Sequence, residues 1–180
     1  MIAGVRGGLA AAWARQRWAV AAGQLLWFAC MAIGIACSGG IESAVRVEPK
    51  PAGPGLWLEV FLNNAKVAAL AFSGVATLGL TTVAFSLLSG LGVGVLIGHA
   101  YALGGSQLLR AVGPHAVLEL PALGLAVAAG LAPVLGLSRR LVSGRGAPFS
   151  QHVVDAAVLF GTSLAALAVA AGVETWVSPR

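Results

Sequence analysis

Residues 111–137 read AVGPHAVLELPALGLAVAAGLAPVLGL, and this stretch decides the fold because it has the length and composition of a membrane-spanning helix. Pro114, His115 and Glu119 stand in its first turns, and no charged residue follows before Arg139. Proline suits the first position of a helix, so we expect the helix to begin at Pro114. His115 and Glu119 are four residues apart and therefore share one helix face. A carboxylate near the end of an apolar helix is costly unless it is paired or hydrated, so the rest of the chain should supply a partner.

The composition excludes an ordinary soluble domain. Hydrophobic residues make up 58% of the 180 residues, charged residues make up 9%, and the mean hydropathy is +0.91. A soluble domain carries roughly 25% charged residues, so we interpret this chain as an integral membrane protein. The formal net charge of +5 comes from short basic clusters beside apolar segments, which is typical of topology signals. The sequence has no basic stripe with interleaved aromatic residues, so no nucleic-acid partner is expected.

The apolar runs predict an all-α fold, namely a polytopic membrane helix bundle in a single domain over residues 1–180. We expect about five transmembrane helices and one short amphipathic interfacial helix. Residues 56–66, LWLEVFLNNAK, predict the interfacial helix because their apolar and polar side chains fall on opposite faces. A turn near residues 77–82 separates the second span from the third. The spans are expected at residues 18–37, 64–81, 83–103, 114–137 and 153–174.

Two interpretations compete for the first apolar run. Basic residues and no acid precede it, as in a secretory signal peptide, but the run is long for a signal peptide and we favour an uncleaved span. The same basic residues place the N-terminus in the cytoplasm, because Lys and Arg favour that side. The basic loop at residues 138–150 is then cytoplasmic, and the Gly- and Pro-rich loop at residues 38–56 lies outside. The predicted localisation is the plasma membrane, with several passes.

A stripe of small residues runs down one face of the third span, where Ser86, Gly90, Gly94 and Gly98 recur every four residues. Such stripes let helix backbones approach closely in lipid, so we interpret these residues as helix-packing positions. The alternative, a glycine loop that cradles a phosphate, needs a strand before it and a helix after it, and the sequence shows neither. The stripe also suggests a homodimer or a larger homo-oligomer.

Alternation of the five spans brings scattered polar residues to one membrane face, at the outer ends of spans two to five. Polar groups at that depth must contact one another or water. The predicted polar cluster consists of Asn63, Asn64, His115, Glu119 and Glu174, with Glu59, Lys66 and His99 on the same face. At the other face, Asp155 starts the last span, where the positive end of a helix favours an anion. We interpret His152 as an ordinary helix-start residue.

Four segments follow one another over residues 61–179: FLNNAKVAALAFSG, SGLGVGVLIG, PHAVLELPA and GVETWVSP. Together they resemble the stage II sporulation protein M family. The pattern of that family has an Asn-Asn pair opening a span, a glycine-rich span, and a Pro-His-Gly-hydrophobic-Leu-Glu-Leu-Pro-Ala motif. A Glu followed by Pro stands near its C-terminus. Ala116 stands where the family usually has Gly, and Ser89 stands where it often has Asn.

The resemblance implies a polytopic membrane protein whose family positions correspond to particular residues of this chain. In spore formers the family works with peptidoglycan-degrading partners, the stage II sporulation proteins D and P, during engulfment. Envelope proteins that remodel peptidoglycan are therefore the expected partners, in addition to the lipid bilayer. The family positions carried over are Asn63 and Asn64, then Pro114, His115, Glu119 and Pro121, and finally Glu174.

Three interpretations of the pair His115 and Glu119 remain open. The first is a hydrogen-bonded pair that pins span four to spans two and five. The second is a polar pocket for a lipid headgroup, glycan or peptide from the outer leaflet. The third is a metal site, since an i, i+4 spacing suits two ligands, and His99 and Glu174 are the nearest further candidates. We favour the first two, and so no cofactor is expected, with a metal at His115 and Glu119 as the less favoured alternative.

Three functions from different classes follow. The favoured one is a scaffold or interaction protein that recruits or regulates cell-envelope machinery through the outer polar cluster. The second is a transporter or flippase for a small solute or lipid, although the inner halves of spans two to four offer almost no polar path. The third is a membrane-embedded metal-dependent enzyme. No Ser or Cys nucleophile has an evident partner, so we assign no catalytic residue and expect no enzymatic activity.

Overall fold

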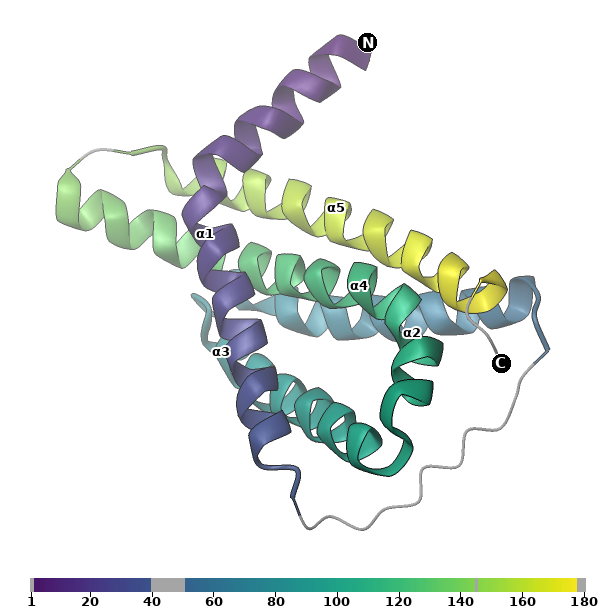
Figure 1. Cartoon of the computed structure of the whole chain (residues 1–180). Coiled ribbons are helices and arrows are strands. Elements are labelled where there is room, and N and C mark those ends of the chain that lie inside the picture. The colour runs from purple at the N-terminus through teal and green to yellow at the C-terminus, as the bar shows by residue number, and fades with distance from the viewer. Residues whose placement is uncertain (1, 40–50, 145, 178–180) are drawn as a thin grey trace.

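The protein is a bundle of helices in the computed structural model (Figure 1). The structure describes residues 2–39, 51–144 and 146–177, and it describes side chains for 8–39, 51–102, 113–144 and 146–177. These residues contain helices and no strand, which confirms the predicted all-α class. Most of the predicted outer loop, residues 40–50, and Arg145 of the basic loop lie outside the described residues. The elements are α1 (Ile2–Ala36), α2 (Pro54–Phe72), η1 (Ser73–Val75), α3 (Leu80–Phe85), η2 (Ser86–Gly90), α4 (Leu91–Ser143) and α5 (Phe149–Trp176).

Four segments within the described residues are long and apolar enough to cross a membrane. Each contains a window of at least 18 residues with few charged side chains, so an aqueous environment would leave large apolar surfaces exposed. The segments are Gly8–Ala36, Leu80–Ala102, Gly113–Ser143 and Phe149–Trp176. The chain is therefore a polytopic membrane protein. Helix α2 is not one of the four segments that are long and apolar enough to cross the membrane.

Helix α2 differs from the prediction. The interfacial helix expected at residues 56–66 and the span expected at 64–81 form one helix that ends at Phe72. The amphipathic part does not lie apart from the bundle, because the Trp57 indole donates a hydrogen bond to the Ala168 carbonyl oxygen of α5 at 3.0 Å and stacks on Phe61. The turn after α2 does fall in the expected region, since Gly79 adopts a left-handed conformation (φ 87°) immediately before α3.

Helix α4 is the centre of the bundle. It lies between α1, α2 and α5 (Figure 1), and residues 122–133 are buried without interruption. The helix does not begin at Pro114 as predicted, because it is continuous from Leu91 and contains Pro114, Pro121 and Pro133. Membrane helices tolerate internal prolines when neighbouring helices satisfy the freed backbone groups. Beside Pro121, the Gln24 amide of α1 donates to the Pro121 carbonyl oxygen at 2.9 Å and ties α1 to α4.

The small-residue stripe packs against α1 of the same chain. A Cβ added at Gly94 would overlap the Met31 carbonyl oxygen and lie 2.9 Å from the Gly34 Cα, so two glycines face each other where the helices cross. Gly90 meets Cys30, and Gly98 meets Ser38 in the same way, while Ser86 is fully buried. The homodimer stays a prediction, and it no longer draws support from these glycines.

Short polar side chains tie the helices together through backbone carbonyl groups. Ser163 of α5 donates to the Ala122 carbonyl oxygen of α4 at 2.6 Å, and Thr82 of α3 donates to the Ala71 carbonyl oxygen of α2 at 2.6 Å. Such interhelical bonds contribute about 0.6 kcal/mol on average within membranes. Their value here is to fix the rotation of α5 and α3 about their axes, which determines where their polar residues lie.

Candidate functional site

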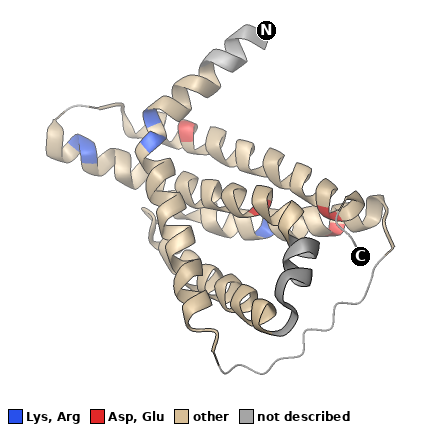
Figure 2. Cartoon of the chain, viewed as in Figure 1, with Lys and Arg blue, Asp and Glu red and all other residues tan. Residues whose placement is uncertain are grey.

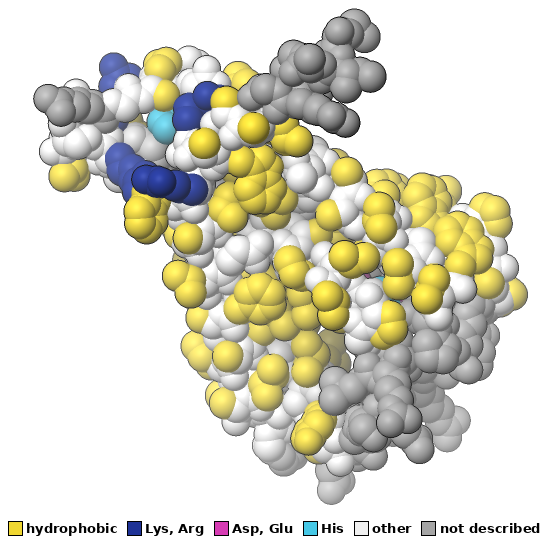
Figure 3. All heavy atoms as spheres, turned by 45° about the horizontal axis from the view of Figure 1, so that its top comes forward, with side chains coloured by type: hydrophobic (Ala, Val, Ile, Leu, Met, Phe, Trp, Pro, Cys, Tyr) yellow, Lys and Arg dark blue, Asp and Glu magenta, His cyan; other side chains and the backbone are white. Residues whose placement is uncertain are grey.

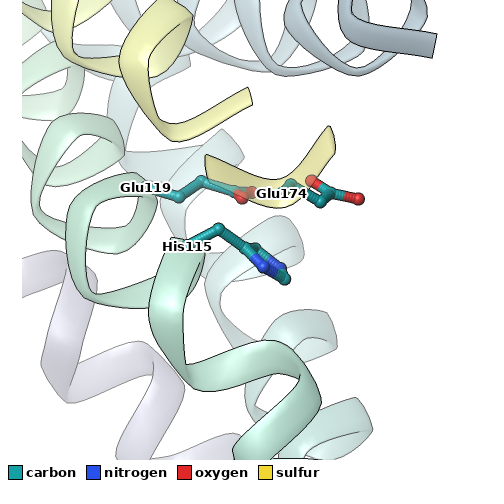
Figure 4. A group of neighbouring side chains, drawn as sticks. All are labelled: His115, Glu119 and Glu174. Carbon is teal, nitrogen blue, oxygen red and sulfur yellow. The ribbon is translucent and has the colours of Figure 1, made fainter. Parts of the chain in front are cut away.

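Three side chains that commonly bind metals converge where α4 approaches the end of α5. His115 and Glu119 come from adjacent turns of α4, and Glu174 comes from the last turns of α5 (Figure 4). One ligand atom from each lies within 4.8 Å of the others, and all three residues are half-buried. The helix face that His115 and Glu119 share therefore meets Glu174, as the alternation of helix direction predicts.

Helix α2 supplies a fourth member of this polar cluster. The Asn64 side chain hydrogen-bonds to the Glu119 carboxylate, and Asn64 is only 7% exposed. Asn63 is exposed on the same helix. Adjacent helical residues point about 100° apart, so only one member of the Asn-Asn pair can face α4. We call Asn64, His115, Glu119 and Glu174 the polar cluster from here on.

Other residues predicted for this face do not belong to the group of three possible metal ligands, His115, Glu119 and Glu174. Glu59 and Lys66 are exposed on α2, and His99 is buried in the first part of α4. The group of ligand atoms within 4.8 Å, among the described residues, contains neither Glu59 nor His99. The structure therefore brings some of the residues predicted for this face together and leaves the others outside the group.

The electrostatics of the polar cluster require a positive charge. Two carboxylates lie together near the end of apolar helices, where like charges repel strongly because water is scarce. A proton, the imidazolium form of His115, or a metal ion would each balance them. One imidazole and two carboxylates also form a suitable three-ligand set for a divalent transition metal, which would leave one coordination position open.

A second polar group lies at the opposite end of the bundle, where Arg residues gather (Figure 2). Asp155 of α5 is 1% exposed and accepts hydrogen bonds from Arg15 Nε at 2.9 Å and Arg15 Nη2 at 2.6 Å. Gln16 Nε2 and Gln151 Nε2 also donate to it, at 2.9 Å and 3.0 Å. The carboxylate is thus held by a bidentate ion pair and two amides, which is a strong arrangement.

Sequence reasoning missed this group. It assigned Asp155 to the helix end and His152 to an ordinary helix start, whereas Gln16 contacts His152 Nδ1 at 2.7 Å and the imidazole is buried. A signal was present, because Gln151, His152 and Asp155 lie within one turn of an otherwise apolar helix. Polar residues grouped in this way predict partners on another helix, and Arg15 and Gln16 are those partners.

Comparison with known proteins identifies the family. A family model described as stage II sporulation protein M matches residues 24–179, which is most of the chain. The match contains all four members of the polar cluster and begins after Arg15 and Gln16. No curated protein and no solved structure matches the chain. With four membrane-crossing segments and a match of this length, the chain belongs to the stage II sporulation protein M family.

Proposed function

We propose that this protein is a membrane scaffold that recruits or regulates peptidoglycan-remodelling machinery, and that the polar cluster is its docking point. The observation that supports the proposal is the convergence of Asn64, His115, Glu119 and Glu174 from three helices at one end of the bundle. Membership of the stage II sporulation protein M family supports a membrane protein of the sporulation type, and the link to the cell envelope is part of the proposal. An interaction role needs fixed polar groups at a membrane surface and does not need a catalytic nucleophile.

The proposed orientation places the polar cluster outside the cytoplasm. Arg15 and Arg17 of α1 lie with Arg139 at one end of the bundle, since the Arg17 and Arg139 guanidinium groups both lie over the Trp18 ring and Arg15 lines the same cavity as Arg139. Basic residues beside membrane spans favour the cytoplasmic side, so this end is cytoplasmic in the proposal. The polar cluster then faces the cell wall, where peptidoglycan-remodelling enzymes work.

The docking proposal is tested by affinity purification from native membranes followed by quantitative mass spectrometry. We expect peptidoglycan-remodelling enzymes to co-purify with the wild-type chain and to fall about tenfold with the Glu119→Gln/Glu174→Gln variant, which corresponds to roughly 1.4 kcal/mol of binding free energy. Gln keeps the shape of Glu and one acceptor oxygen but removes the charge.

Glu59→Gln is the matched control, because it removes a carboxylate from α2 outside the group of ligand atoms. Its co-purified proteins should equal those of the wild type. If no envelope enzyme is enriched over an unrelated membrane bait, or if all three chains recover it equally, the docking proposal is wrong.

A second candidate function, metal binding at the polar cluster, is favoured by the 4.8 Å grouping of His115, Glu119 and Glu174. It predicts about one divalent metal ion per chain in protein purified without a histidine tag, with Zn²⁺ the best fit to this ligand set. His115→Ala should lose the metal and Glu59→Gln should keep it, as measured by inductively coupled plasma mass spectrometry. Metal-free wild-type protein that also fails to bind added Zn²⁺ at micromolar concentration would eliminate this candidate.

A further inference from the structure

A cavity opens at the basic end of the bundle, far from the polar cluster along α5. Its volume is about 590 Å³, within the range of roughly 300–1,000 Å³ that is typical of small-molecule sites. The end of α4, the turn after it and the start of α5 form its walls, and Arg15 of α1 contributes as well. The described residues that line it include no carboxylate, and its polar lining consists of Arg15, Ser138, Arg139, Ser143 and His152.

His152 is a hydrogen-bond donor in this lining. Asp155 accepts a hydrogen bond from Gln16 Nε2, which identifies that atom as the amide nitrogen, and the same nitrogen lies 2.7 Å from His152 Nδ1. An amide nitrogen can only donate, so Nδ1 accepts and the proton of the neutral imidazole must be on Nε2. Nε2 is buried and has no hydrogen-bond partner among the described residues. A buried donor without an acceptor is unfavourable, and the His152 side chain that carries it belongs to the cavity lining.

The imidazole is held in position by the helix opposite. A Cβ added at Gly136 of α4 would lie 2.5 Å from three ring carbons of His152, so only glycine leaves room for the ring there. The Gln16 amide is in turn oriented by Asp155, and Asp155 is fixed by Arg15. The ion pair therefore serves to set the tautomer and the position of His152.

Asp155 compensates the charge of Arg15, so Arg139 supplies the uncompensated positive charge of the cavity. The Arg139 guanidinium lies 5.2 Å from the centre of the Trp18 ring, a cation–π contact that orients the group but does not neutralise it. Figure 3 shows the basic side chains gathered around a histidine at this end of the molecule. The cavity lining thus combines an uncompensated guanidinium with a histidine that carries an N–H unpaired in the described part of the chain, while its two serine hydroxyls donate to backbone carbonyl groups of α4.

We propose that this cavity binds an anionic phosphate group, supplied either by a phospholipid headgroup or by free phosphate. A phosphate has several acceptor oxygens and prefers a guanidinium with additional N–H donors, which is what the cavity offers. The cavity lies at the ends of membrane-spanning segments, where lipid phosphates are abundant, and basic pockets between such helices bind anionic headgroups. The inference is independent of the docking proposal, which concerns the other end of the bundle.

The test uses the full chain in detergent, with native mass spectrometry in the presence of phosphatidylglycerol or phosphatidylcholine. We expect the wild type to retain phosphatidylglycerol over phosphatidylcholine, and Arg139→Gln to lower that retention about fivefold, the usual effect of one cation at a lipid surface. His152→Asn should lower it as well, because Asn keeps an acceptor for Gln16 but loses the donor at Nε2. Arg140→Gln is the control, since Arg140 carries the same charge on the next residue and does not line the cavity.

A second arm separates the two sources of phosphate. Inorganic phosphate is titrated at constant ionic strength and the melting temperature is followed. A melting temperature that rises in the wild type, but not in Arg139→Gln or His152→Asn, would support the site and assign free phosphate as its ligand. The proposal is wrong if neither arm distinguishes the wild type from these two variants, or if Arg140→Gln loses phosphatidylglycerol as strongly as Arg139→Gln. Melting curves without ligand check that each variant is folded.

Discussion

The Asp155→Ala chain is expected to have a free energy of unfolding about 1–3 kcal/mol below that of the wild type, because the substitution leaves the buried Gln16 amide without its acceptor, while the partly exposed Arg15 guanidinium can still be hydrated. Asp155 is 1% exposed and accepts hydrogen bonds from Arg15, Gln16 and Gln151. Removing the carboxylate leaves the buried Gln16 amide without that acceptor and removes the ion-pair partner of Arg15. Unfolding in increasing sodium dodecyl sulfate, followed by tryptophan fluorescence, gives the measurement.

A double-mutant cycle separates the ion pair from general damage to α5. Arg15→Ala alone should also destabilise the bundle, and the double variant should lose clearly less than the sum of the two single losses. Arg140→Ala, on an exposed face of α4, should stay within about 0.5 kcal/mol of the wild type. Additive single effects, or a loss below about 1 kcal/mol for Asp155→Ala, would show that the pair does not hold α1 to α5.

The second large effect is expected from Gly94→Leu, which should destabilise the bundle by about 3 kcal/mol or more. Backbone contacts backbone at this position, because a Cβ would overlap the Met31 carbonyl oxygen and lie 2.9 Å from the Gly34 Cα. A flexible side chain could move aside, but two packed helices can only separate. The melting temperature and the protease resistance of the purified chain measure the loss.

Gly92 offers a matched control two residues away. A Cβ there would meet nothing within 4 Å, and the residue is exposed, so Gly92→Leu changes the same helix by the same volume without forcing α1 away. Its stability should equal that of the wild type apart from a small gain in helix propensity. If Gly92→Leu and Gly94→Leu destabilise the chain equally, the close contact between α1 and α4 is not what makes Gly94 important.

Part of the fold and of the polar cluster follows from the sequence by simple physics. The apolar length of residues 111–137 predicts a central membrane helix, and residues 122–133 are its buried core. The i, i+4 spacing of His115 and Glu119 predicts a common face, and alternation of helix direction predicts that Glu174 lies near it. These conclusions need only helix periodicity and membrane thickness, which do not depend on details of packing.

Other features depend on tertiary contacts that the sequence does not express. Proline rules predict a helix start at Pro114, but α4 continues through it, as membrane helices can. Composition predicts a separate interfacial helix at residues 56–66, but the bond from Trp57 to Ala168 incorporates it in the bundle. The partner of Asp155 is 140 residues away in the chain, and nothing in the local pattern of α5 identifies Arg15.

Helix α5 carries a charged anchor near each end, Asp155 at one and Glu174 at the other, and its middle packs on α4 through Ser163 and Leu167. One continuous helix therefore joins the Arg15–Asp155 ion pair to the polar cluster, so the two polar groups at opposite ends of the bundle share a single element.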